Sequence, residues 1–205
     1  MNTPAEPYNI CAVPPGNAPE PPLAALLLRD ALLLAVFAGI AVLVDGWLQS
    51  GWTAYIAGAV GFVAGFQGNG LCHEWGHYLG ARLAGARAPR NRLGSVFPLF
   101  HFDIDSNSHG QFMAMSVGGN LLQWLFAIAL LLALDSDSPG RLGLQCGALG
   151  FAILGSLTEL PIIVDALRRG DGRAAWQAYL PQRERVKVRT FTLGMPLIVA
   201  SVFLV

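Results

Sequence analysis

The amino-acid sequence predicts an all-α integral membrane protein with about five transmembrane helices. The 205 residues are 54% hydrophobic and 13% charged, whereas about a quarter of the residues in a soluble domain are charged. Asp, Glu, Lys and Arg are absent from four long windows, 52–72, 112–134, 142–158 and 190–205. A helix needs about 20 apolar residues to cross a bilayer core, and a soluble protein of this length does not need several such windows.

The first 22 residues precede any hydrophobic segment. They hold seven prolines and no Lys or Arg. A secretory signal peptide instead begins with basic residues followed by an apolar core. We therefore expect residues 1–22 to form a disordered or extended Pro-rich arm, and residues 23–205 to form a single transmembrane domain.

The hydrophobic segments can be placed in order along the chain. Arg29 and Asp30 lie near the start of the first segment, so its membrane span begins near Ala31. The second segment is too long for one span, and its charged C-terminal part extends beyond the hydrocarbon. The five predicted segments are 23–48, 52–84, 111–134, 142–168 and 189–205.

The loops between these segments differ in charge. With five spans, the loops near 85–110 and 169–188 lie on the same side as the N-terminus, and together they hold Arg87, Arg90, Arg92, Arg169, Arg173, Arg183, Arg185 and Lys187. On the opposite side the only basic residue is Arg141, beside Asp135 and Asp137. The positive-inside rule makes the N-terminal side cytoplasmic. We expect a multi-pass protein of the plasma membrane, the inner membrane in a bacterium, with residues 183–189 against anionic lipid headgroups. The net charge of zero gives no reason to expect nucleic-acid binding.

A His-Glu-x-x-His motif lies in the second segment, at His73, Glu74 and His77. Residues four apart on a helix lie on nearly the same face, so the two histidines can bind one metal ion. Glu74 can reach a metal-bound water as a general base, and zinc lowers the pKa of that water to about 7. Ionisable residues within a membrane segment are costly and mark functional sites. The alternative is a hydrogen-bonded structural cluster between helices.

The stretch from His73 to Gly85, HEWGHYLGARLAG, resembles the signature helix of the site-2 protease family, which are intramembrane zinc metalloproteases. The resemblance implies a three-helix core: one helix with the zinc motif, one central helix and one helix with a third ligand. The segments 52–84, 111–134 and 142–168 match that order, so the protease-like core covers about 52–168. It also implies Zn²⁺ as the cofactor and a transmembrane protein as the substrate.

Two further elements of the resemblance carry candidate site residues. The central helix has Ser-Val-Gly-Gly-Asn, ending at Asn120, where the family has a Gly-Pro-x-x-Asn-like stretch. Asn120 is therefore a candidate catalytic residue, or alternatively an interhelical hydrogen-bonding group. In the next helix Pro161 is expected to interrupt the helix, and Asp165 is the expected third zinc ligand. The alternative for Asp165 is an ion pair with Arg168 or Arg169.

Other polar residues on the same side compete with these assignments. Glu159 is expected either to orient a zinc-bound histidine or to pair with a loop arginine. Alternating apolar and polar residues from 97 to 105 predict a short β-strand or hairpin near 97–110, which the resemblance implies could pair with an unwound substrate. Rival third ligands lie in the loop 101–109, at His101, Asp103, Asp105 and His109.

The sequence therefore predicts a zinc metalloendopeptidase that hydrolyses a peptide bond in a membrane-embedded substrate. Zinc would be bound by His73, His77 and Asp165, and Glu74 would activate water. The alternative is a non-catalytic membrane protein that keeps a structural or regulatory metal site. A di-iron oxidase is disfavoured, because that chemistry needs more histidines than the four in this chain. The oligomeric state stays open.

Overall fold

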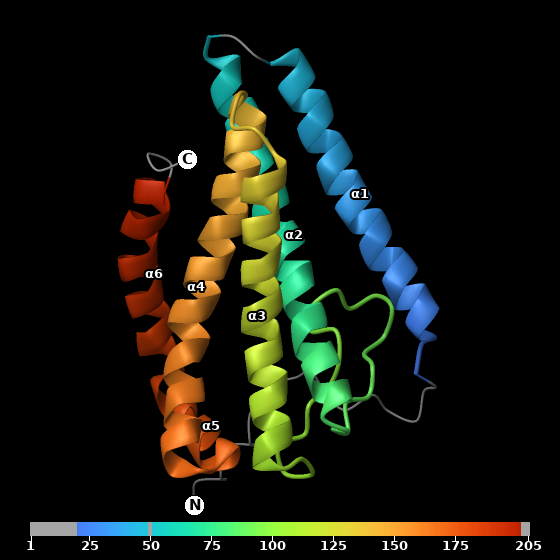
Figure 1. The fold of residues 1–205 in the computed structure, drawn as a ribbon, viewed down its shortest axis with the longest axis vertical. Coiled ribbons are helices and arrows are strands. Elements are labelled where there is room, and N and C mark those ends of the chain that lie inside the picture. The colour runs from blue at the N-terminus through green and yellow to red at the C-terminus, as the bar shows by residue number, and fades with distance from the viewer. Residues whose placement is uncertain (1–19, 49–50, 202–205) are drawn as a thin grey trace, which may run out of the picture.

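The computed structural model describes residues 20–48 and 51–201, and these residues form an all-helical bundle (Figure 1). Most of the predicted Pro-rich arm, residues 1–19, lies outside the described residues. The helices in chain order are α1 (Leu23–Trp47), α2 (Thr53–Leu83), α3 (His109–Ala133), α4 (Pro139–Arg169), α5 (Gly172–Tyr179), the short 3₁₀ helix η1 (Leu180–Gln182) and α6 (Arg183–Ser201).

Three of these helices, α1, α3 and α4, are long and apolar enough to cross a membrane. Helix α2 coincides with the predicted segment 52–84, and α6 overlaps the predicted segment 189–205 but begins six residues earlier; neither helix is among the three. In α2 the apolar sequence is interrupted by Gln67 and Asn69, and then by His73, Glu74 and His77. The protein is therefore compatible with a membrane, and it has three candidate spans within 20–48 and 51–201.

Helix α2 is the centre of the bundle and packs against α1, α3 and α4. Figure 1 shows α1 along one side of the bundle and α6 along the other, next to α4. Glycines allow α2 to approach its neighbours closely. A Cβ at Gly65 would lie 2.0 Å from the carbonyl oxygen of Leu144 on α4, and one at Gly76 would lie 2.4 Å from that of Gly118 on α3.

The prediction of a β-strand or hairpin near 97–110 is wrong, because no strand occurs within the described ranges. A single antiparallel bridge joins Arg90 to Phe100. Beside the bridge, the His101 N–H donates to the carbonyl oxygen of Pro89 at 2.8 Å. The extended backbone then stops because the side chain of Asp103 accepts the N–H of Asp105 at 2.9 Å, which favours a turn. Helix α3 begins soon afterwards, at His109.

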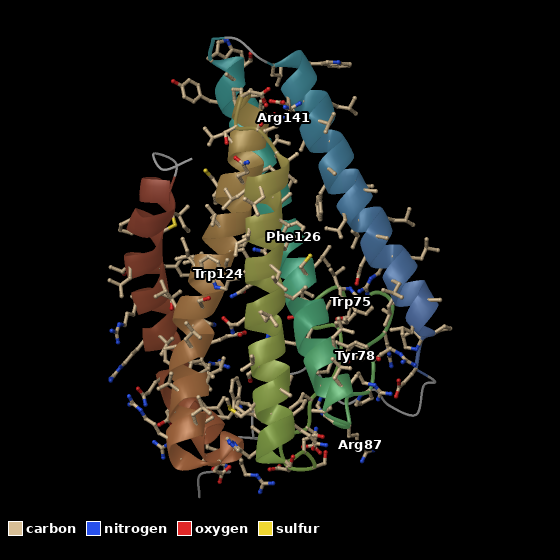
Figure 2. The ribbon with its side chains drawn as sticks, in the orientation of Figure 1. Trp75, Tyr78, Arg87, Trp124, Phe126 and Arg141 are labelled. Carbon is tan, nitrogen blue, oxygen red and sulfur yellow. The ribbon has the colours of Figure 1, made fainter. Side chains whose placement is uncertain are left out.

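The loop between α2 and α3 is held against the bundle by α1. Arg29 Nη1 donates to the carbonyl oxygens of Leu93 at 2.9 Å and Ser95 at 2.7 Å. Asp30 is only 3% exposed; it pairs with Arg29 and accepts the indole N–H of Trp75 at 2.8 Å. Figure 2 shows Trp75 on the side of α2 that faces this loop. Arg29 and Asp30 thus connect α1 to both the loop and the motif-bearing helix.

Candidate metal centre

Three potential metal ligands converge between α2 and α4: His73, His77 and Glu159. The two Nε2 atoms of the histidines lie 2.9 Å apart. Glu159 Oε1 lies 3.0 Å from His73 Nε2 and 3.1 Å from His77 Nε2. Among the residues that the structure describes, this is the one group of His, Cys, Asp or Glu side chains with the spacing of a metal site.

The donor set of His73, His77 and Glu159 fits zinc. Two histidines and one glutamate are a ligand set of catalytic zinc sites, with the fourth position left for water or substrate. Tetrahedral zinc with ligands at about 2.0–2.1 Å requires donor atoms roughly 3.3–3.4 Å apart. The three observed separations of 2.9–3.1 Å are shorter by only a few tenths of an ångström. Small side-chain rotations therefore suffice to admit the ion.

The surroundings prepare His77 to bind through Nε2. Its Nδ1 atom lies 2.8 Å from the carbonyl oxygen of Met115 on α3. Because a carbonyl oxygen can only accept, Nδ1 carries a proton, and Nε2 is the ring nitrogen that faces Glu159 and His73 and is available to a metal ion. A backbone acceptor of this kind commonly fixes the tautomer and ring plane of a zinc-bound histidine. The side chains of His73, His77 and Glu159 are only 9%, 12% and 24% exposed, so the carboxylate lies in a setting that favours a cationic partner.

The predicted ligand Asp165 does not lie in this cluster. Helix α4 runs unbroken from Pro139 to Arg169, so Pro161 does not interrupt it as predicted. In a continuous helix, six residues correspond to about 9 Å of rise and about 240° of rotation, so Asp165 lies on a different face of α4 from Glu159. Its carboxylate accepts from Arg169 Nε at 2.7 Å and is 35% exposed. The structure brings Glu159 to the histidines and pairs Asp165 with Arg169.

The rival ligands in the loop 101–109 also lie outside the metal cluster. His101 is buried, and its Nδ1 has no hydrogen-bond partner among the described residues. The backbone N–H of Asp105 donates to Asp103, which lowers the pKa of the Asp103 carboxyl. Asp105 pairs with Arg173 at 2.9 Å. His109 is the first residue of α3. These polar groups shape the loop and its contact with α5.

Glu74, the predicted general base, lines the same pocket as the three potential ligands. Its Oε2 atom accepts the backbone N–H of Leu99 at 3.0 Å. The loop between α2 and α3 therefore restrains the carboxylate at the pocket and leaves Oε1 free of that contact. This arrangement suits a general base beside a metal, because the carboxylate is positioned but not neutralised by a cation.

Asn120, the second catalytic candidate, contacts a potential ligand. Its Nδ2 donates to Glu159 Oε2 at 2.6 Å, which joins α3 to α4. The interhelical hydrogen bond considered from the sequence is therefore present, and its acceptor belongs to the metal cluster. In this geometry Asn120 orients Glu159.

A pocket of about 180 Å³ adjoins the cluster. Its polar wall consists of His73, Glu74, His77, Glu159 and Ser116. The remaining wall is apolar and comes from the loop, α3, α4 and α5: Pro98, Phe100, Phe102, Phe112, Met115, Ile162, Ile163 and Trp176. The site therefore combines a charged floor with walls that suit an apolar side chain.

The sequence did not predict that Glu159 lies beside both histidines, although the residue was considered there as a group that orients a histidine or pairs with a loop arginine. A signal for this position was available, because Glu159 directly follows the uncharged window 142–158 and would complete a His₂Glu donor set.

No family model matches the chain, and comparisons with curated proteins and with solved structures give no match either.

Proposed function

We propose that the protein is an intramembrane zinc metalloprotease in which His73, His77 and Glu159 bind the metal ion. The observation that carries this proposal is the convergence of three donor atoms within 3.1 Å, with Glu74 in the same pocket. The ligand Asp165 expected from the family resemblance is replaced here by Glu159. The resemblance of residues 73–85 to the site-2 protease family supports the reaction class.

Zinc at this position would supply a Lewis acid that makes water nucleophilic near neutral pH and polarises a peptide carbonyl. Glu74 would accept the proton of the attacking water and pass it to the departing amide nitrogen. The Leu99 N–H would hold the Glu74 carboxylate in place during both transfers. Met115 and Asn120 would keep His77 and Glu159 oriented.

The walls of the pocket indicate the substrate class. Phe100, Phe112 and Ile163 leave room for a side chain but offer no partner for a charge. We therefore propose that an apolar residue flanks the scissile bond, as expected for a transmembrane substrate. Backbone groups inside a bilayer are already hydrogen-bonded in a helix, so the substrate must unwind locally. The extended backbone around Phe100, beside the pocket, is a suitable place for the unwound strand to pair.

The membrane arrangement follows from the site. The proposal takes α2 and α6 as spans in addition to α1, α3 and α4, because α2 is enclosed by its three neighbours and can keep its polar residues away from lipid. The motif lies in the C-terminal half of α2, near the basic loops. The positive-inside rule then places the site toward the cytoplasm of a plasma membrane.

One observation favours a second candidate, a non-catalytic protein with a structural metal site. The backbone N–H of Leu99 in the loop between α2 and α3 already donates to Glu74 Oε2, and the loop lines a pocket of only about 180 Å³. A protein of that class would bind zinc but hydrolyse nothing.

Reconstitution into phospholipid vesicles distinguishes the two candidates. A library of synthetic transmembrane peptides with apolar central residues would be added, and cleavage would be followed by mass spectrometry for the wild type and Glu74→Gln. Zinc content would be measured in the same samples. Loss of a general base typically costs 10²–10⁴-fold in rate, so the wild type should cleave and the variant should be slower by about that factor with unchanged zinc. A zinc-loaded wild type that cleaves no peptide in the library would support the second candidate instead.

A further inference from the structure

Behind Glu159 lies a group of buried polar side chains that the proposed reaction does not use directly. Gln123 on α3 is fully buried, and Ser156 on α4 is 7% exposed. Burial of polar groups such as these is unfavourable unless they find partners. Their partner is Asn120, and Figure 2 shows the neighbouring Trp124 on the side of α3 that faces α4. The group therefore connects the α3–α4 interface to the proposed metal ligand.

The hydrogen bonds in this group fix the direction of each donor. The indole N–H of Trp124 can only donate, and it donates to Ser156 Oγ at 2.8 Å. Gln123 Nε2 lies 3.3 Å from the carbonyl oxygen of Ala152, which can only accept, so this nitrogen is the donor end of the Gln123 amide. The same nitrogen donates to Asn120 Oδ1 at 3.0 Å. Ser156 Oγ also donates to Asn120 Oδ1, at 3.2 Å.

Two donors at Oδ1 allow only one orientation of the Asn120 amide. A flipped amide would place its NH₂ group against the NH₂ of Gln123 and its oxygen against the Glu159 carboxylate. In the observed orientation Nδ2 donates to Glu159 Oε2 at 2.6 Å. Glu159 Oε1 then remains directed at the two histidines, 3.0 and 3.1 Å away.

We infer that Gln123 and Ser156 are positioning residues for the metal site: they fix the Asn120 amide, which in turn holds one oxygen of Glu159 and presents the other to zinc. This inference rests on the zinc site of the proposed function and does not depend on turnover. Groups that orient a metal ligand typically account for 10–100-fold in metal affinity.

A structural role alone would predict a different result. If these residues only joined α3 to α4, their loss would lower the stability of the protein and leave zinc affinity unchanged. Gln145 offers a matched control, because it is another buried glutamine, 1% exposed, whose Nε2 donates to the carbonyl oxygen of Leu134 at 2.7 Å, away from the metal cluster. Each of the substitutions Gln123→Met and Gln145→Met removes one buried glutamine amide, the first next to Asn120 and the second away from the metal cluster.

The test measures the zinc dissociation constant of the detergent-solubilised full chain by competition with a chelator, and thermal unfolding of the metal-free protein. We expect Gln123→Met and Ser156→Ala to bind zinc 10–100-fold more weakly than the wild type. Gln145→Met should bind zinc within threefold of the wild type even if it unfolds at a lower temperature. Ser156→Thr, which keeps the hydroxyl, should restore most of the affinity lost in Ser156→Ala.

Each outcome of this test decides the inference. Folded Gln123→Met and Ser156→Ala proteins with wild-type affinity would overturn it, as would an equal loss of affinity in Gln145→Met. If Gln123→Met does not fold, Ser156→Ala decides the matter, because it removes a single oxygen atom. A wild type that binds zinc but cleaves no peptide would contradict the proposed protease and leave this inference standing. A wild type that binds no zinc would overturn both.

Discussion

A methyl group added at Gly119 should disrupt the proposed metal centre without replacing any proposed ligand. Gly119 lies on α3 against the ring of His77. A Cβ at this position would lie 2.3 Å from His77 Cε1, 2.5 Å from Nδ1 and 2.6 Å from Nε2. Favourable contacts between carbon atoms begin at about 3.5 Å, so in Gly119→Ala the ring and the α3 backbone must separate by roughly 1 Å.

The expected loss of zinc affinity follows from that displacement. Metal–ligand distances tolerate only about 0.2 Å, so a shift of roughly 1 Å removes His77 from the coordination shell. The same shift breaks the contact of Nδ1 with the Met115 carbonyl at 2.8 Å. The free energy of zinc binding in small structural sites is about 10–16 kcal/mol. Divided among three or four ligands, this gives about 3–4 kcal/mol for each ligand. Gly119→Ala should therefore weaken zinc binding by roughly two to three orders of magnitude.

The assay is chelator competition on the purified protein, with circular dichroism to establish that the variant is folded. Gly110→Ala is the matched control, because it makes the same change on the same helix where a Cβ meets nothing within 4 Å. The control should bind zinc like the wild type. A folded Gly119→Ala protein whose affinity stays within threefold of the wild type would refute the placement of His77 in the site.

Three further substitutions test the fold that carries the site, each by unfolding of the solubilised protein. Ser108→Ala removes the side-chain cap of α3 and should lower the free energy of unfolding by about 1 kcal/mol; an unchanged free energy of unfolding would contradict a formed capping box. Asp30→Ala removes the buried carboxylate that pairs with the Trp75 indole and with Arg29, and should lower the free energy of unfolding by about 3–5 kcal/mol. A loss below 1 kcal/mol would show that these two contacts of Asp30 contribute little to the fold. Gly65→Ala places a Cβ 2.0 Å from a carbonyl oxygen of α4 and should be strongly destabilising, whereas Gly58→Ala, with its nearest atom at 3.4 Å, should be tolerated; equal effects of the two would contradict the close packing of α2 on α4.

The sequence predicted the helical elements well, because their main determinant is local. The charge-free windows mark segments that can be buried or can face lipid, and α1 to α4 begin and end within three residues of the first four predicted segments. Helical periodicity alone predicts that His73 and His77 lie on the same face of the helix. The all-helical class is confirmed for the described residues. The predicted strand failed because alternation over a few residues does not distinguish a paired strand from an extended loop with one bridge.

The residue of α4 that lies beside the two histidines could not be predicted in the same way, because it depends on how α4 is rotated against α2. Glu159 and Asp165 lie in the same predicted segment and on the same side of the protein, so depth in the membrane does not separate them. The rotation is set by backbone contacts between the helices, such as that of Gly65 with Leu144. Which residue of α4 faces His77 therefore emerges only from the packing.

The contacts of the loop between α2 and α3 could not be predicted from the sequence either. Arg29 meets the carbonyl oxygen of Leu93, 64 residues away, and the backbone N–H of Leu99 meets Glu74. No pattern in the sequence pairs an arginine with a particular carbonyl. The sequence did, however, mark Glu159 as a residue with a polar partner, whereas Arg29 and Asp30 were used only to place the start of the first span.

The most direct test of the account is the zinc content and affinity of Glu159→Ala beside Asp165→Ala. We expect one tightly bound zinc ion per chain in the wild type and in Asp165→Ala, which loses only a partly exposed pair with Arg169. Glu159→Ala should lose roughly two to three orders of magnitude in zinc affinity, as expected for a missing ligand. Zinc retained at wild-type affinity in Glu159→Ala, and lost in Asp165→Ala, would contradict the proposed metal centre.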